Sequence, residues 1–248
     1  MSKIKLKDIS TRAPKTMDKN ETKEKTSGII TALDDLQNLL YAESHHSILV
    51  IIQAMDAAGK DGVIRNVFGD LNPQGVTVKS FKAPTAEELS HDFLWRVHSH
   101  APAKGMIQVF NRSHYEDILI TRVHKWCDDD TAKKRMDAIN DFEELLQKHN
   151  NTQILKFYLH VSPEEQQLRL KERLDDPKKQ WKYNDKDFGE AKLWDLYMEM
   201  YEECFEACDK VPWTIVPSDQ NWYKEHIIAT ALYETLSKLD MRYPGLKK

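Results

Sequence analysis

Cysteine is scarce in this chain: its 248 residues include only three, Cys127, Cys204 and Cys208. Three thiols provide no disulfide framework, and this composition is typical of proteins kept in a reducing cytoplasm. Cys204 and Cys208 are four residues apart, a spacing that suits two metal ligands on a helix as well as core packing. Because no matching Cys/His pair lies nearby, we expect both side chains to pack in the core.

Long apolar runs are also missing. No stretch approaches the roughly 20 residues that a membrane-spanning helix requires. Residues 1–25 are polar and rich in lysine, and they lack the apolar segment of a secretory signal. We therefore expect a cytoplasmic protein that does not use a membrane as a partner.

An excess of basic charge is absent as well, since 36 Lys and Arg residues face 40 Asp and Glu residues and the net charge is −4. Nucleic acid is therefore not an expected partner, and any site for a polyanion must be a local basic patch. The length fits one large α/β domain or one such domain with an inserted lid.

Strand-like apolar runs alternate with helical patterns, which predicts an α/β fold with a parallel sheet between two helical layers. Residues 1–27 have few large apolar side chains and are predicted to be an extended or mobile N-terminal arm, followed by a single domain over 28–248. The predicted strands are 48–53, 76–81, 106–110, 154–160 and 214–216. The predicted helices are 29–41, 61–69, 85–99, 114–126, 131–149, one starting at 162, 189–208 and 222–239, with an irregular segment at 177–188.

The stretch SILVIIQAMDAAGKDG, which starts at Ser47, is the most informative part of the chain. It predicts a buried strand, a tight loop ending in Gly59-Lys60, and the start of a helix. In a phosphate-binding loop of this kind, backbone N–H groups, the positive end of the helix and a lysine bind phosphate oxygens. The alternative interpretation is a chance A-A-G-K turn between a strand and a helix.

Two residues depart from the pattern G-x-x-x-x-G-K-[ST]: Ala54 replaces the first glycine, and Asp61 replaces the Ser or Thr that would bind Mg²⁺. Asp56 lies within the loop, where a carboxylate would repel phosphate. A bound Mg²⁺ would reverse that effect, so we predict that Asp56 is a metal ligand.

The segment NRSHYED follows the third predicted strand. Asn111 at the strand end is neutral, whereas Glu116 and Asp117 come one or two helical turns later and could reach back to a metal. Arg112 could bind phosphate with its forked donors. The alternative is a polar cap on a surface helix, since Ser113 and the two carboxylates suit a helix N-terminus.

Two further segments carry basic residues. Lys82-Ala-Pro84 follows the second predicted strand, where nucleotide kinases place the acceptor pocket, and Lys82 and Arg96 could contact a phosphate there. Basic residues also gather between Arg169 and Lys182, which favours a mobile lid at about 163–190 that closes over phosphates. The alternatives are an ordinary strand-to-helix loop and a solvated charged helix.

Together these segments resemble the polyphosphate kinase family 2, from about residue 33 to about residue 236. The resemblance is carried by the segments MDAAGKDG (from Met55), NPQG (from Asn72), FKAP (from Phe81), HDFLWRVH (from His91), FNRSHYED (from Phe110) and WKY (from Trp181). It implies a thymidylate-kinase-like P-loop fold with a helical lid. It also implies reversible, Mg²⁺-dependent transfer of the terminal phosphoryl group of inorganic polyphosphate to nucleotides, with Mn²⁺ as an alternative metal.

The resemblance also implies residue roles. The implied catalytic residues are Asp56, Lys60, Arg112 and Asp117, of which Asp56 and Asp117 would bind the metal. The implied phosphate- and polyphosphate-binding residues are Ala57, Ala58, Gly59, Lys60, Asp61, Gly62, Arg65, Arg122, Arg169, Lys171, Arg173, Lys178 and Lys179. The implied nucleotide-binding residues are Lys82, Pro84, Arg96, Asn111, Arg112 and Glu116.

The version of the NRSHYED segment found here, with Asn111 and His114, is similar to the subgroup that phosphorylates both nucleoside monophosphates and diphosphates. Asn111 weakens the case for a metal ligand at the strand end and favours Asp117. The implied partners are polyphosphate, AMP, ADP and ATP, with guanine nucleotides as further candidates. Because the family commonly forms dimers or tetramers, a homodimer or homotetramer is expected.

Two other functions remain as alternatives. An ATP-dependent nucleoside monophosphate kinase shares the fold, but Asp61 argues against it because the usual Mg²⁺ ligand is missing. A non-catalytic regulator that binds nucleotide or polyphosphate would keep Lys60 and tolerate loss of the metal carboxylates. The presence of both Asp56 and Asp117 argues against that second alternative.

Overall fold

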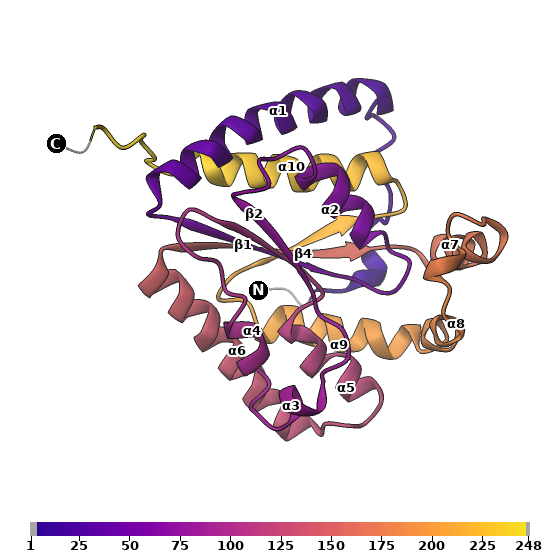
Figure 1. Ribbon diagram of the computed structural model, residues 1–248. Coiled ribbons are helices and arrows are strands. Elements are labelled where there is room, and N and C mark those ends of the chain that lie inside the picture. The colour runs from indigo at the N-terminus through magenta and orange to yellow at the C-terminus, as the bar shows by residue number, and fades with distance from the viewer. Residues whose placement is uncertain (1–3, 247–248) are drawn as a thin grey trace.

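The computed structural model describes residues 4–246 and has three layers, with a sheet between two layers of helices (Figure 1). The five strands are all parallel and lie in the order β2-β3-β1-β4-β5. They are β1 (Ser47–Gln53), β2 (Val76–Ser80), β3 (Ile107–Asn111), β4 (Thr152–His160) and β5 (Trp213–Pro217). The predicted α/β/α fold is confirmed, and every predicted strand end lies within two residues of the observed one.

Helices cover both faces of the sheet (Figure 1). One face carries α1 (Lys19–Glu43), α2 (Lys60–Phe68) and α10 (Asn221–Ser237). The other face carries α3 (Ala86–Leu89), α4 (Trp95–His98), α5 (Ile120–Val123), α6 (Asp129–Asn150) and α9 (Trp194–Ala207). Side chains of β1 alternate between the two apolar cores, which explains why this strand is apolar along its whole length.

The register of the central strands brings two loops together at one edge of the sheet. Ile52 of β1 pairs with Asn111 of β3, and the N–H of Arg112 donates to the carbonyl of Ile52 at 3.1 Å. The segments that follow these strands therefore start side by side. This is the carboxyl edge of a parallel sheet, where ligands of such folds usually bind.

A small helical unit projects beyond this edge (Figure 1). It consists of α7 (Pro163–Asp175), the 3₁₀ helix η3 (Gln180–Lys182) and α8 (Asp185–Ala191). The hydroxyl of Ser162 caps α7, and Pro163 is its first residue. The unit matches the segment predicted to be a lid.

The N-terminal region differs from the predicted extended or mobile arm. Helix α1 begins at Lys19, so it crosses the predicted boundary between residues 27 and 28. Before it, Leu6 is buried in the core and its carbonyl lies 3.1 Å from Nε2 of His160. The composition hid this helix because Thr22 and Thr26 occupy buried positions that larger apolar residues usually fill.

Three predicted helices are each divided into two. Residues 85–99 form α3 and α4, because the Asp92 carboxylate accepts from the N–H of Leu94 and starts a new turn there. Residues 114–126 form the 3₁₀ helix η2 (His114–Ile118) and α5, separated by the non-helical backbone of Leu119. The third, 189–208, is split between α8 and α9, and α8 begins within the segment predicted to be irregular.

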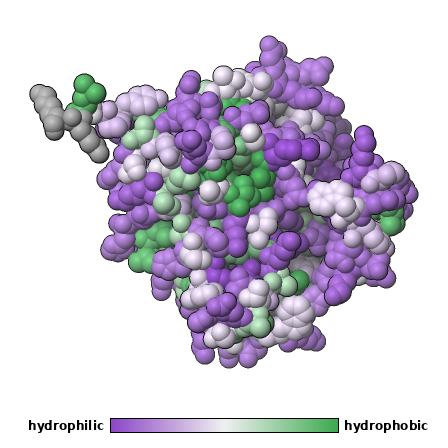
Figure 2. All heavy atoms as spheres, in the orientation of Figure 1, coloured by the Kyte–Doolittle hydropathy of each residue, from purple (hydrophilic) through white to green (hydrophobic). Residues whose placement is uncertain are grey.

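The outer surface is mostly polar on the face that Figure 2 shows, with an apolar patch over the edge strand β2, where Val78 is half exposed. Within residues 4–246, no helix combines the length and the apolar character that crossing a membrane requires. All three cysteines are free thiols, and Cys204 and Cys208 are buried, as predicted for core packing.

A fully buried ion pair supports the segment after β3. The ammonium of Lys156, on β4, lies 2.8 Å from Oε2 of Glu143 on α6 and donates to the hydroxyl oxygen of Tyr115 at 2.8 Å. The Tyr115 hydroxyl in turn donates to Oε1 of Glu143 at 2.7 Å. These bonds attach η2, which begins two residues after Arg112, to a strand and a long helix.

We predict that Lys156→Met lowers the free energy of unfolding by about 3–5 kcal/mol, because it leaves the Glu143 carboxylate buried without its cation. Urea denaturation measures the change. Lys210→Met is the matched control, since Lys210 also pairs with carboxylates of α6 but on the exposed surface. Equal stability of the two variants would contradict this assignment.

Candidate active site

The phosphate loop connects β1 to α2. Gly59 has a φ of +99° and Ala57 a φ of +61°, so the chain turns sharply through the left-handed region before the helix starts. The buried ammonium of Lys60 donates to the carbonyl oxygens of Ala54 at 3.0 Å and Met55 at 3.1 Å. Burial and the nearby charge of Arg112 lower the pKa of Lys60 to about 8. Both acceptors are uncharged carbonyl oxygens, and a phosphate oxygen could replace them as the partner of the Lys60 ammonium.

Arg112 joins the two loops at the sheet edge. Its guanidinium pairs with the carboxylate of Asp56 in the phosphate loop and lies 3.2 Å from Oε2 of Glu116. Burial raises the pKa of Asp56, but the positive charges of Arg112 and Lys60 outweigh it and hold that pKa below its ordinary value. Asp56 is therefore a carboxylate at neutral pH, and Arg112 is fixed between two anions.

Asp61, the residue in place of Ser or Thr, contacts two neighbouring segments. Its Oδ1 accepts from the amide of Asn111 at 3.0 Å, and its Oδ2 lies 2.7 Å from the ammonium of Lys182 on η3. Burial raises the pKa of Asp61, whereas the hydrogen bonds from Lys182 and Asn111 lower it to a net value below the ordinary one. The phosphate loop is thus attached directly to the projecting helical unit.

Two cavities open at this edge. The first, which we call the basic groove, has a volume of about 580 Å³ and is lined by seven basic and four acidic residues. The basic residues of this lining include Lys60, Arg112, Arg173, Lys179 and Lys182. The surplus of positive side chains supplies the local basic patch that a polyanion requires on a chain of net charge −4.

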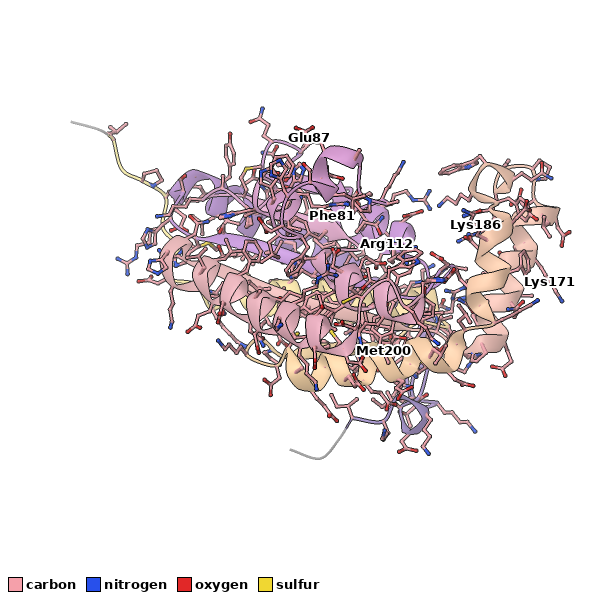
Figure 3. The ribbon with its side chains drawn as sticks, turned by 90° about the horizontal axis from the view of Figure 1, so that it is seen from below. Phe81, Glu87, Arg112, Lys171, Lys186 and Met200 are labelled. Carbon is pink, nitrogen blue, oxygen red and sulfur yellow. The ribbon has the colours of Figure 1, made fainter. Side chains whose placement is uncertain are left out.

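The second cavity, the apolar pocket, has a volume of about 560 Å³. Its walls include Pro84, Leu89, Ile120, Trp126 and Tyr197. Four residues line both cavities, namely Asp56, Phe81, Lys82 and Arg112. Figure 3 shows Arg112 on the side of the body that faces the helical unit. A ligand with an apolar ring and a phosphate tail could lie in the pocket with its tail at the groove.

Most of the predicted site residues come together around these cavities. Ala57, Gly59, Lys60, Asp61, Gly62, Asn111, Arg169, Arg173 and Lys179 line the groove, and Pro84, Arg96, Glu116 and Asp117 line the pocket. Asn111, predicted for nucleotide binding, thus lies on the groove side. Ala58 is fully buried, and its carbonyl is turned into the protein.

Besides Ala58, four predicted phosphate ligands lie outside both linings. Arg122 is bound to Asp129 and Glu203 through its guanidinium, so it forms a surface ion-pair cluster. Arg65 is exposed on α2. Lys171 points away from the body on the outer side of α7 (Figure 3), and Lys178 is exposed on the same unit. The spacing of basic residues in the sequence did not show which face of α7 lines the groove.

Arg169 reaches the site but binds backbone. It donates to the carbonyl oxygens of Ala58 at 2.9 Å and of Ser218 at 2.8 Å. Longer bonds go to the carbonyl oxygens of Ala57 at 3.3 Å and Asp219 at 3.0 Å. Its Nε also donates to Glu165 at 2.8 Å. Its N–H groups therefore hold the phosphate loop against α7 and the end of β5. Fewer of these N–H groups are left for the predicted direct contact with polyphosphate.

The carboxylates set what the site can hold. Asp117 lines the apolar pocket near Arg96 and Arg135, and burial raises its pKa to about 6. In the described part of the chain, no group of three or more His, Cys, Asp or Glu side chains is placed to hold a metal ion. An oxygen-liganded ion such as Mg²⁺ needs only one or two protein carboxylates when substrate phosphates supply further oxygens, and Asp56 suits that arrangement.

Two lysines of the site were missed by sequence reasoning. Lys182 stands within the WKY segment but was not singled out from the other basic residues near it. Lys224 on α10 is fully buried, and its ammonium donates to the carbonyl of Ala58 at 3.0 Å. A signal for Lys224 did exist, because it precedes Ile228 and Leu232 at four-residue intervals on the apolar face of the helix.

Comparisons with known proteins agree with this geometry. A family model described as polyphosphate kinase 2 (PPK2) matches residues 16–244. The AMP/ADP-polyphosphate phosphotransferase of Meiothermus ruber is 48% identical over 214 residues, which are 86% of this chain and 80% of that protein. The ADP-polyphosphate phosphotransferase of Rhodopseudomonas palustris is 44% identical over 229 residues, covering 87% of this chain and 79% of that protein.

Among solved structures, that of polyphosphate kinase 2 from Arthrobacter aurescens TC1 matches with a TM-score of 0.96 and 41% sequence identity. The match covers 100% of this chain and 90% of that one. The family match spans both the phosphate loop and the helical unit, so the predicted resemblance is confirmed. The chain belongs to the polyphosphate kinase 2 family.

Proposed function

We propose that this protein transfers the terminal phosphoryl group of inorganic polyphosphate to nucleoside monophosphates and diphosphates, in a reversible reaction. The observation that carries the proposal is the meeting of the basic groove and the apolar pocket at Asp56 and Arg112. A relative that is 48% identical and named for both AMP and ADP supports the dual choice of acceptor.

The two cavities suit the two substrates. Polyphosphate has no sequence to read, so lysine and arginine side chains along the groove are sufficient to bind it, and its binding weakens as salt rises. A nucleotide base fits the apolar pocket, with Lys82 and Arg96 beside its phosphates. Glu116 and Asn111 contribute to acceptor choice through their contacts with Arg112 and Asp61.

The reaction needs no protein nucleophile. An oxygen of the acceptor phosphate attacks the terminal phosphorus of polyphosphate, and the bond from that phosphorus to the bridging oxygen breaks. The electron pair of that bond remains on the shortened polyphosphate. Lys60 and Arg112 hold the transferring group in line and offset its charge, which is the main contribution that a protein makes to phosphoryl transfer.

Mg²⁺ is the proposed metal, with Mn²⁺ as the alternative. When bound, it neutralises negative charge on the phosphates during transfer. Asp56 is the proposed protein ligand, because its carboxylate faces both cavities and stays ionised. Asp117 is the second candidate, from the pocket side.

Movement of the helical unit completes the proposal. Closure of α7, η3 and α8 over the groove would bring Arg173, Lys179 and Lys182 onto the polyphosphate and exclude water.

A cytoplasmic location, use of guanine nucleotides and assembly as a homodimer or homotetramer stay predictions that follow from the family and the composition.

The acceptor range can be tested directly. With Mg²⁺ and polyphosphate but no ATP, we expect AMP to give ADP and then ATP, and ADP to give ATP, as followed by chromatography of the nucleotides. ATP from ADP alone would contradict the dual acceptor. Turnover only with ATP and a nucleoside monophosphate would instead identify a nucleoside monophosphate kinase, and binding without turnover would identify a regulator.

Lys60→Ala should lower kcat/KM for polyphosphate by about 10²–10³-fold, the loss expected when one donor to developing charge is removed. The wild-type kcat/KM should also fall as pH rises above about 8. The sign follows from the lowered pKa of Lys60: the free enzyme loses this positive charge well below the ordinary lysine range.

Initial rates measured across pH test both statements, with Lys148→Ala on the exposed face of α6 as the control. The Lys60→Ala variant should lack the part of the decline that occurs above about pH 8. A variant with nearly normal rates would remove Lys60 from the site.

Asp56→Asn should lower kcat by at least about 100-fold, because a metal ion contributes several kcal/mol of charge stabilisation in phosphoryl transfer. Thermal unfolding should change little, since the side chain packs in no apolar core and Arg112 keeps its ion pair with Glu116. Titration of activity against Mg²⁺ completes the test, with the exposed Asp70→Asn as the control. An unchanged Mg²⁺ requirement at a normal rate would exclude Asp56 as the metal ligand.

A further inference from the structure

Lys224 is a buried cation that the reaction described above does not use. It lies on the inner face of α10 in line with Ile228, Leu232 and Leu236, and all four side chains are fully buried. Lysine is rarely buried without a paired anion. The only hydrogen bond recorded for the Lys224 ammonium, within residues 4–246, goes to the carbonyl oxygen of Ala58 at 3.0 Å.

The charged groups around Lys224 do not neutralise it. From α7, Arg169 and Glu165 face it; from α2, Lys60 does; and Glu225 is its neighbour on α10. Burial and the charge of Arg169 together lower the pKa of Lys224 to about 7, in spite of the two carboxylates. Among residues 4–246, no carboxylate forms a direct ion pair with this ammonium.

The position of Lys224 relative to the phosphate loop explains what its hydrogen bond does. The Ala58 carbonyl also accepts from Arg169 at 2.9 Å, so two cations hold it on the inner side of the loop. In a trans peptide the C=O and the following N–H point in opposite directions, so the N–H of Gly59 is directed away from Lys224. Gly59 itself lines the basic groove.

Gly59 is also required by this contact. A Cβ atom at that position would lie 2.2 Å from Nζ of Lys224, and the φ of +99° already disfavours any other residue. The glycine of the Gly59-Lys60 pair therefore leaves room for a second lysine against the loop, and Lys224 itself is not among the residues that line the groove.

We propose that Lys224 is a positioning residue for phosphoryl transfer, which directs the N–H of Gly59 to the phosphate and places a positive charge behind it. The proposal rests on the proposed function of the groove as a phosphate site. Bound phosphate supplies the anion that the buried ammonium lacks, so binding favours its protonated form and is accompanied by uptake of a proton.

The experiment compares the wild type with Lys224→Met, which has a similar length and no charge. Lys238→Met, at the exposed end of the same helix, is the control. Three quantities are measured on the full chain: kcat and KM for polyphosphate with ADP, the melting temperature, and the binding of tripolyphosphate. Calorimetry in two buffers of different ionisation enthalpy, near neutral pH, gives the number of protons taken up on binding.

For Lys224→Met we expect kcat/KM to fall by about 10–100-fold, the usual loss when a supporting group behind a site is removed. The melting temperature should not fall, because a buried charge without an anion is replaced by an apolar side chain. Proton uptake with tripolyphosphate should be smaller than in the wild type, and Lys238→Met should behave as the wild type.

Normal kcat/KM in Lys224→Met, or proton uptake equal to that of the wild type, would overturn the proposal. A fall in melting temperature in proportion to the loss of activity would also overturn it, since a purely structural role predicts that result. If the wild type binds tripolyphosphate but transfers no phosphoryl group to ADP, the proposed function fails while the proton measurement still tests Lys224.

Discussion

The arrangement of the site depends on the two ion pairs that the guanidinium of Arg112 forms. The guanidinium connects the loop after β1 to the segment after β3 by pairing with Asp56 and Glu116. These strands are neighbours in the sheet, so hydrogen bonding of the strands has already brought the two loops together. A left-handed backbone at Arg112, with a φ of +60°, then turns its side chain to the junction of the two cavities.

Support for this junction comes from both layers of helices. On one side, the buried pair of Lys156 and Glu143 holds η2 through Tyr115. On the other side, Arg169 and Lys224 hold the phosphate loop by its carbonyl groups. Held in this way, the phosphate loop and the segment after β3 lose little freedom when substrate binds, which is the condition for effective charge stabilisation.

The sequence predicted those features that local pattern determines. The strand, glycine-lysine loop and helix around Lys60 were predicted because apolar periodicity and a short loop suffice to define them. The bonds from Arg169 to backbone carbonyls were not predicted, because their acceptors at Ala58 and Ser218 are distant in the chain. The start of α1 at Lys19 was missed for a different reason. A helix whose buried positions hold threonine has the same polar composition as an extended arm.

Backbone carbonyls, more than carboxylates, keep the cations of the phosphate loop in place. Lys60 binds the carbonyls of Ala54 and Met55, and Arg169 and Lys224 share that of Ala58. A carbonyl orients a cation without cancelling its charge, whereas a carboxylate would neutralise it and compete with the substrate. The loop therefore keeps uncompensated positive charge in a chain of net negative charge, and the carboxylates that do enter it are paired, Asp56 with Arg112 and Asp61 with Lys182.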